Sequence, residues 1–124
     1  MDRFTDTRYV AVRTFRRSGT PVDTPVWPIV ADGKLYFGTP EHTHKVTRIQ
    51  SNLQVQVAMC DSRGNTTGPW TDGQARVLTA NEFEPYRQRI DQRHPIACRA
   101  IRLVAKLRRW NYVGIEITQL SNGS

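Results

Sequence analysis

The segment TPEHTHKVTRIQSNLQVQVAMCDSRG, residues 39–64, contains the end of one strand, a short helix and a complete second strand. In residues 42–51, Val46 and Ile49 are three apart, as on one face of an amphipathic helix. Residues 53–59 alternate apolar side chains with polar or small ones, which predicts a half-buried strand. The segment therefore predicts a short helix that crosses from one strand to the next.

Three side chains around the start of this helix form a candidate anion site. Lys45 and Arg48 are three apart on a neighbouring face, and Thr39 precedes the first turn. A helix start suits an anion because its free N–H groups and the positive end of its dipole point the same way. Charges on short helices are mostly solvated. The spacing alone thus favours a solvated face and leaves the anion site as the alternative.

Outside this segment the pattern is that of a small antiparallel barrel. Strands are predicted at residues 8–15, 22–30, 35–38, 53–59, 70–79 and 112–118. Small, polar residues at 16–20 and the Asp32-Gly33 pair indicate tight turns. Pro25 and Pro28 cannot donate to a ladder, so the second strand is predicted to lie at an edge or a bulge. Residues 1–7 are expected to be a flexible N-terminus, 8–118 a single domain and 119–124 a flexible tail.

Two consecutive helices are predicted between the last two strands. Asn81 is a plausible N-cap for the first, and Pro95 interrupts the pattern before the second. The second helix, at about residues 96–109, has Ala97, Ile101 and Val104 on one face. Gly73, in the strand before the helices, indicates a bulge or a close approach.

Composition limits the classes of function. The length of 124 residues fits one domain. Residues 1–7 lack the apolar core of a signal peptide, and no apolar run approaches the roughly 20 residues of a membrane span, so a cytoplasmic protein is expected. Cys60 and Cys98 do not make a disulfide framework, and a buried structural thiol is expected at Cys60. The histidines and cysteines lack zinc spacing, so no metal site is predicted.

The net charge of +7 is concentrated in one segment. Residues 87–109 contain eight basic residues and only Asp91 as an acid, whereas basic and acidic residues cancel in the remainder. Three interpretations are open: a solvated helix face, a site for the polyanionic tail of a cofactor, and a nucleic-acid surface. Stacking aromatics are sparse there, with only Trp110 and Tyr112 at its end, so no nucleic-acid site is expected.

Short motifs in order over residues 9–118 resemble the deazaflavin-dependent branch of the pyridoxamine 5'-phosphate oxidase-like split β-barrel family. They are TFRRSGTPV at 14–22, TPVW at 24–27, DGKLYF at 32–37, Thr39, KVTRI at 45–49, CDSRG at 60–64, Gly68 and GQARV at 73–77. The sequence departs from the family pattern at Thr43 and His44, where members usually have a small residue and a glycine. It also departs at Leu53 and Met59, where many members have proline.

The resemblance implies a mainly β split barrel with a few helices, paired as a homodimer with a cofactor at each interface. It implies that the isoalloxazine-like ring lies against Thr24, Pro25, Val26 and Trp27. The phosphate side would be held by Thr39, Lys45 and Arg48, with Val46 beside them, and Arg63 and Trp70 would come from the partner chain. From the residues alone, Trp27 fits the barrel core equally well, and Arg63 fits a solvated loop charge.

The function implied is that of an oxidoreductase that uses coenzyme F420 and transfers a hydride to a small, electron-poor conjugated substrate. No catalytic side chain is singled out, because the cofactor supplies the chemistry. The alternatives are an FMN-binding flavoprotein of the same fold and a non-catalytic coenzyme- or polyanion-binding module. Haem is an occasional cofactor of the family.

Overall fold

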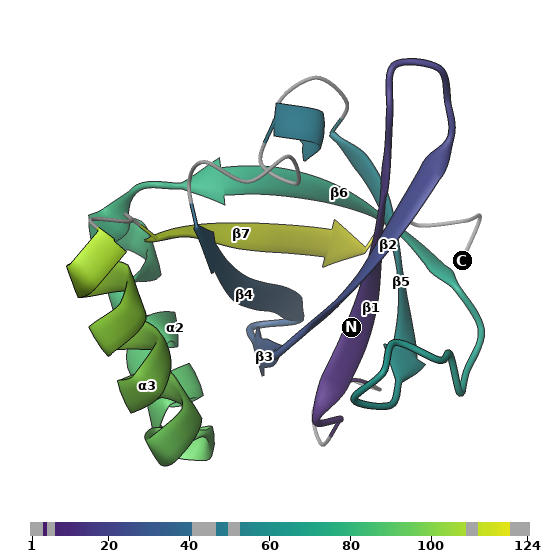
Figure 1. Ribbon diagram of the computed structural model, residues 1–124. Coiled ribbons are helices and arrows are strands. Elements are labelled where there is room, and N and C mark those ends of the chain that lie inside the picture. Colours follow the sequence, from purple (N-terminus) through teal and green to yellow (C-terminus); the bar gives the residue numbers. More distant parts are fainter. Residues whose placement is uncertain (1–3, 5–6, 41–46, 50–52, 109–111, 120–124) are drawn as a thin grey trace.

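A computed structural model describes residues 4, 7–40, 47–49, 53–108 and 112–119. Its named elements are seven strands and two helices (Figure 1): β1 Tyr9–Phe15, β2 Pro21–Val26, β3 Ile29–Ala31, β4 Lys34–Pro40, β5 Gln54–Cys60, β6 Thr71–Leu78, α2 Ala80–Arg93, α3 Pro95–Arg108 and β7 Tyr112–Gln119. Residues 47–49 are also helical, within the predicted crossover helix. Lys45 and Val46 lie outside the described residues.

The strands form one antiparallel sheet in the order β2-β1-β5-β6-β7-β4-β3. β2 and β3 follow one another in the sequence but lie at opposite ends of this order. Trp27 and Pro28 connect them, and no ladder joins the two strands in the described part of the chain. The curled sheet is therefore split at this connection, as expected for a split barrel, and β2 is the edge strand that Pro25 predicts.

Two details of the strands differ from the sequence expectation. Residues 22–30 form two strands rather than one, because Pro28 cannot continue the ladder and the chain changes sheet edge there. Gly73 makes no bulge: it pairs with Val55 on one side and Gln119 on the other in unbroken register. The predicted Asp32-Gly33 turn is confirmed. Both residues have positive φ, 53° and 75°, as a two-residue type I′ hairpin requires.

The buried side chains form two clusters. The first fills the barrel and consists of Phe4, Val10, Val12, Val26, Leu35, Phe37, Ile49, Val55, Val57, Ala75, Ile115 and Ile117. The second lies between the sheet and the helices and consists of Ile29, Tyr36, Leu78, Phe83, Ile90 and Cys98. The helix pair is therefore fixed to one side of the barrel, where α2 and α3 lie side by side (Figure 1).

The N-cap of α2 lies two residues before Asn81. Thr79 is the N-cap, and its hydroxyl accepts a hydrogen bond from the Glu82 N–H at 3.2 Å. The Glu82 carboxylate accepts in return from the Thr79 N–H at 3.0 Å, which completes a capping box. The prediction of Asn81 as N-cap was wrong because Asn81 already lies inside the first turn.

The face that α3 turns inward also differs from the prediction. Cys98 and Ala105 are its buried residues, Ile101 is half-buried, and Val104 is 43% exposed. The buried face is therefore rotated from the predicted Ala97, Ile101 and Val104. Most of the apolar side chains of α3 consequently point away from the protein.

α2 approaches the sheet closely because two glycines lie under Phe83. A Cβ at Gly38 in β4 would lie 3.1 Å from the Phe83 ring, and a Cβ at Gly114 in β7 would overlap ring atoms of Phe83. Gly38 and Gly114 are directly paired between the two strands. The glycine pair thus forms a recess that seats the aromatic ring and fixes the height of α2 above the sheet.

Candidate functional site

A cavity of about 700 Å³ lies where the barrel is split, between the β2–β3 connection and the helix pair. Its lining comes from the barrel, the 61–69 loop and both helices: Tyr9, Pro25, Val26, Trp27, Gly38, Thr39, Pro40, Ser62, Phe83, Arg87, Ile90, Asp91, Cys98, Ile101, Arg102, Ala105, Lys106 and Tyr112. The volume is in the range of small-molecule and cofactor sites, about 300–1,000 Å³.

The barrel wall of the cavity contains four residues that the sequence singled out. Pro25 and Val26 end β2, Trp27 follows them, and Thr39 lies near the end of β4. Val26 and Thr39 are buried, and their backbones belong to strands fixed by ladders to β1 and β7. Thr24 belongs to the same strand and pairs with Val12, but it does not line the cavity. The structure therefore brings most of the predicted ring-binding strand to one wall.

The helical wall carries the charge. The Asp91 carboxylate forms ion pairs with two guanidinium groups, Arg102 from α3 and Arg87 at 3.1 Å from its own helix. Arg87 also pairs with Glu84, and this hydrogen bond is the main reason that the pKa of Arg87 is raised. Lys106 also lines the cavity, and it has no ion-pair partner among the side chains that the structure describes. A ligand in the cavity therefore meets an excess of positive charge.

Trp27 packs against His94, the C-cap residue of α2. The two rings are stacked, with centroids 4.4 Å apart and planes 13° apart. The His94 Nε2 atom is buried and has no hydrogen-bond partner in the described part of the chain. Burial, followed by the charges of Arg93 and Arg8, lowers the pKa of His94, so the ring stays neutral. Trp27 both lines the cavity and packs against the second hydrophobic cluster.

Arg48 lies elsewhere. Its Nε donates to the Thr14 hydroxyl at 2.8 Å, and Thr14 is buried in β1. Burial, with Arg16 nearby, lowers the pKa of Arg48. Tyr9, at the other end of β1, lines the cavity. The five residues of strand from Thr14 to Tyr9 span roughly 16 Å. The guanidinium of Arg48 and the cavity are therefore at separate places on this chain.

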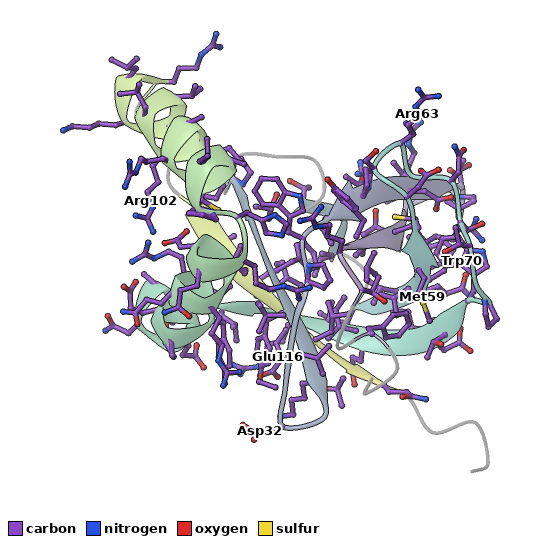
Figure 2. The ribbon with its side chains drawn as sticks, turned by 90° about the horizontal axis from the view of Figure 1, so that it is seen from below. Asp32, Met59, Arg63, Trp70, Arg102 and Glu116 are labelled. Atoms are coloured by element: carbon purple, nitrogen blue, oxygen red, sulfur yellow. The ribbon has the colours of Figure 1, made fainter. Side chains whose placement is uncertain are left out.

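Arg63 and Trp70 also lie outside the cavity. Arg63 is exposed in the loop after β5, where its backbone N–H donates to Asp61 at 2.9 Å, and its side chain extends outward (Figure 2). The half-buried Trp70 has the Arg13 guanidinium carbon 4.0 Å from its ring centroid. Ser62, next to Arg63, does line the cavity. Neither Arg63 nor Trp70 lines the cavity of its own chain.

The helical lining was not among the predicted site residues, although the sequence left the basic segment at 87–109 open as a site for a cofactor tail. Arg87 and Asp91 are four apart, as are Arg102 and Lys106, so each pair shares a helix face. What the sequence does not show is which face of each helix points to the barrel. Cys98 and Tyr112 also line the cavity, and burial raises the pKa of both. Cys60 is buried as expected, and burial raises its pKa as well.

Tyr36 belongs to a hydrogen-bond network separate from the cavity. Its hydroxyl donates to the Glu116 carboxylate at 3.1 Å, and its ring stacks on Tyr86 with centroids 3.7 Å apart. Glu116 is only 9% exposed and also accepts from Arg76. Burial is the main reason that the pKa of Tyr36 is raised. This network braces α2 against β4 and β7 and contributes nothing to the cavity lining.

The site as a whole is a cleft with an aromatic and aliphatic body and cations on one wall. Such an arrangement suits a flat, partly apolar ligand that carries negative charge. Within the described residues, no group of three or more histidine, cysteine or acidic side chains could hold a metal ion. Neither described helix is long and apolar enough to cross a membrane.

Comparison with solved structures places the fold. A candidate pyridoxamine 5'-phosphate oxidase from Listeria innocua has a TM-score of 0.63 at 12% identity, over 92% of this chain and 85% of its own. An F420 reductase has a TM-score of 0.63 at 16% identity, over 97% and 93%. An FAD-binding protein from Mesorhizobium loti has a TM-score of 0.65 at 16% identity, over 95% and 83%.

These likenesses establish that the chain has the split β-barrel fold of pyridoxamine 5'-phosphate oxidase-like proteins. They confirm the mainly β fold class expected from the sequence motifs. No protein-family model matches the sequence, and no curated protein matches it. The likeness lies in the arrangement of the chain, because all three identities are below 25%.

Proposed function

We propose that this protein binds a flavin-type coenzyme, coenzyme F420, in the cavity at the split of the barrel. We propose further that it is a reductase acting on a small, electron-poor conjugated substrate. The observation that carries the proposal is the cavity itself, in which the end of edge strand β2 and Trp27 face cations of α3. The names of structural neighbours support a flavin or deazaflavin, since one is an F420 reductase and another is FAD-binding.

The residues of the cavity fit a planar ring with a polar edge. Within the described residues β2 is paired only to β1, so the backbone groups on its outer edge are available to a ring carbonyl or N–H. Adjacent residues of a strand turn their backbone N–H and C=O groups to opposite edges, so Thr24 and Val26 share one edge, and Pro25, which has no N–H, offers only a carbonyl at the other. Phe83, Ile90 and Ile101 supply the apolar contacts that keep water from the ring.

Two sets of cations are available for the anionic tail. We propose that Thr39, Lys45 and Arg48, with Val46 beside them, hold the phosphate as the family resemblance implies. Because Arg48 lies outside the cavity, this proposal requires the tail to extend beyond the cavity that holds the ring. Arg102 and Lys106 lie on the cavity wall and form a second set, suited to the further negative charges of a deazaflavin tail. FMN has a shorter tail with one phosphate, so the two sets together favour the longer, more highly charged coenzyme.

We also propose that two chains pair, so that Arg63 and Trp70 reach the cofactor bound by the partner. Neither side chain lines the cavity of its own chain, which is compatible with such a role. A bound deazaflavin supplies hydride transfer. The residues of this chain bind and orient the coenzyme and the substrate. Tyr112 lines the cavity, and because burial raises its pKa, its phenol stays protonated and can donate a hydrogen bond there.

Titration of the purified protein with F420 and separately with FMN, followed by fluorescence, tests the proposal. We expect saturable binding of F420 and weaker binding of FMN. A reduced F420 preparation mixed with the protein and conjugated enones or quinones should then lose its reduced state faster than without the protein. Failure to bind either coenzyme at micromolar protein contradicts the proposed function. Tight FMN binding with none to F420 favours the flavoprotein alternative, and F420 binding without turnover favours a coenzyme carrier.

A further inference from the structure

The outer face of α3 is apolar over its whole length. Five large apolar side chains are exposed in the described part of the chain, and four of them belong to this helix. They are Ile96 at 84% exposed, Leu103 at 59%, Val104 at 43% and Leu107 at 75%. The fifth, Leu53, lies elsewhere, before β5. Exposed apolar residues are normal when scattered singly, whereas a group on one element marks an interaction surface.

These four side chains and Ala100 lie on one arc of the helix. At 100° per residue they span an arc about 100° wide, the width of the apolar face of an amphipathic helix. The arc is opposite Cys98 and Ala105, the residues that α3 buries. α3 packs on α2, whereas α2 packs on the strands, so the helix lies at the outside of the molecule (Figure 1). We refer to Ile96, Ala100, Leu103, Val104 and Leu107 as the outer arc.

Positive charge flanks the outer arc. On the helix surface, Arg99 and Lys106 lie next to one edge of the outer arc, and Arg108 lies next to the other edge. α3 contains no acidic residue. Neither Arg99 nor Lys106 has an ion-pair partner among the described side chains. Arg102, whose side chain is labelled in Figure 2, is turned to Asp91 and the cavity instead. The surface that complements this helix is therefore both apolar and negatively charged.

A second copy of the chain does not offer that surface. Away from α3 the described barrel exposes only Leu53 among large apolar side chains, so a second copy would have to place its own outer arc against this one. An antiparallel pair of α3 helices would then bring Arg99 close to Lys106 of the other copy, and like charges oppose such contact. Charge complementarity thus argues against an arc-to-arc dimer.

We infer that the outer arc of α3 binds the surface of a membrane that contains anionic phospholipids. The helix would lie in the plane of the interface, with Leu103 and Leu107 among the acyl chains and Arg99 at the headgroup phosphates. The cavity lies on the side of α3 that carries Cys98 and Ala105, opposite the outer arc. A protein docked through the outer arc therefore keeps the cavity away from the bilayer. Membrane-dissolved quinones and other conjugated lipids would then be close to the protein.

Vesicle flotation with the full chain tests this inference. The probes are vesicles of equal parts phosphatidylglycerol and phosphatidylcholine, and vesicles of phosphatidylcholine alone. We expect binding to the anionic vesicles, strongly weakened at high salt, and little binding to the neutral ones. The double variant Leu103→Gln/Leu107→Gln should bind at least about tenfold more weakly, since it loses two apolar side chains that would be buried in the membrane. Leu53→Gln, which removes an exposed leucine elsewhere, should bind like the parent.

A charge-matched pair isolates the electrostatic part. Arg99→Gln should weaken binding about fivefold, because each cation near an anionic surface contributes about that factor. Arg17→Gln removes the same charge from the β1–β2 turn and should have little effect. All variants should keep the parent's circular dichroism and melting temperature, since the altered side chains are exposed.

Three results would overturn the inference. The first is no binding to the anionic vesicles at low salt. The second is equal binding by the parent and by Leu103→Gln/Leu107→Gln. The third is a parent that sediments as a dimer while the double leucine variant sediments as a monomer, which would assign the outer arc to a second copy of the chain.

Discussion

Trp27 and His94 are stacked with their ring centroids 4.4 Å apart, so a titratable ring lies directly behind an aromatic wall of the cavity. Trp27 lies in the connection between β2 and β3, and His94 lies between the two helices. The stack therefore ties the split edge of the barrel to the helix pair. It also gives that contact a dependence on pH.

Stability should fall as His94 is protonated. Its pKa is lowered in the folded protein, so below the ordinary histidine value of about 6.5 the unfolded chain binds a proton that the folded chain does not. The contribution of neutral His94 to the free energy of unfolding is fully present above pH 6.5, and it is lost as the pH falls through the lower pKa of the folded protein. Melting temperatures measured from pH 7.5 to 5 should decline, and His94→Gln should reduce the decline. An identical decline in that variant would show that other groups cause it.

Gly114 should tolerate no side chain. In Gly114→Ala the new methyl group would overlap the ring of Phe83, so α2 must move from the sheet, at a cost of about 1–3 kcal/mol. Gly68→Ala is the control, since its Cβ would lie at an ordinary 3.7 Å from Met59 and its φ is not positive. Urea unfolding measures both. Similar midpoints for the two variants would mean that the Phe83 recess is easily repacked.

The capping box predicts different effects for two neighbouring residues. Thr79→Ala removes the hydroxyl that accepts from the Glu82 N–H and should cost about 1 kcal/mol in the free energy of unfolding. Asn81→Ala alters an exposed residue inside the helix, where alanine has the higher helix propensity, and should be neutral or slightly stabilising. If chemical denaturation instead finds Asn81→Ala the more damaging, the helix begins at Asn81.

Cofactor affinity should separate the two sets of cations. Arg48→Ala and Lys45→Ala should each weaken F420 binding roughly tenfold to a hundredfold, since a sheltered charge-assisted hydrogen bond contributes about 1.5–3 kcal/mol. Lys106→Ala should weaken it less, by roughly fivefold, because its side chain is exposed. Arg17→Gln serves as the control for net charge. A larger loss for Lys106→Ala than for Arg48→Ala would place the coenzyme tail on α3.

The sequence predicts the barrel well because its signals are local. The alternation in β5, the Asp32-Gly33 turn and the edge position of Pro25 each depend on neighbouring residues. The rotation of α3 was mispredicted because the helix has two apolar faces. Cys98 and Ala105 face inward although Ile96, Leu103 and Leu107 are larger. Only the packing of α3 against α2 decides between the two faces, and no periodicity contains that information.

The barrel wall of the candidate site was predictable from the sequence, whereas its helical wall was not. Pro25, Val26, Trp27 and Thr39 belong to motifs that the family resemblance identifies, and they meet at one wall of the cavity. Arg87, Asp91, Arg102 and Lys106 look like a solvated helical stripe in the sequence. They become cavity lining through the packing of the helix pair on the barrel, to which Gly38 and Gly114 contribute by letting Phe83 of α2 approach the sheet. The contribution of these charges depends on non-local contacts such as those of Phe83 with Gly38 and Gly114, which lie 45 and 31 positions away in the sequence.

The place of β7 in the sheet has a consequence for biosynthesis. The ribosome makes β7 after the other six strands of the described sheet, yet β7 lies between β6 and β4 and connects the two groups of strands. Until residues 112–119 emerge, the β3–β4 hairpin has no strand to join it to the rest of the sheet. The nascent chain therefore exposes the edges of β4 and β6 throughout translation, and closure is a late, non-local event. Chaperone demand during synthesis should depend on how quickly this final strand is released.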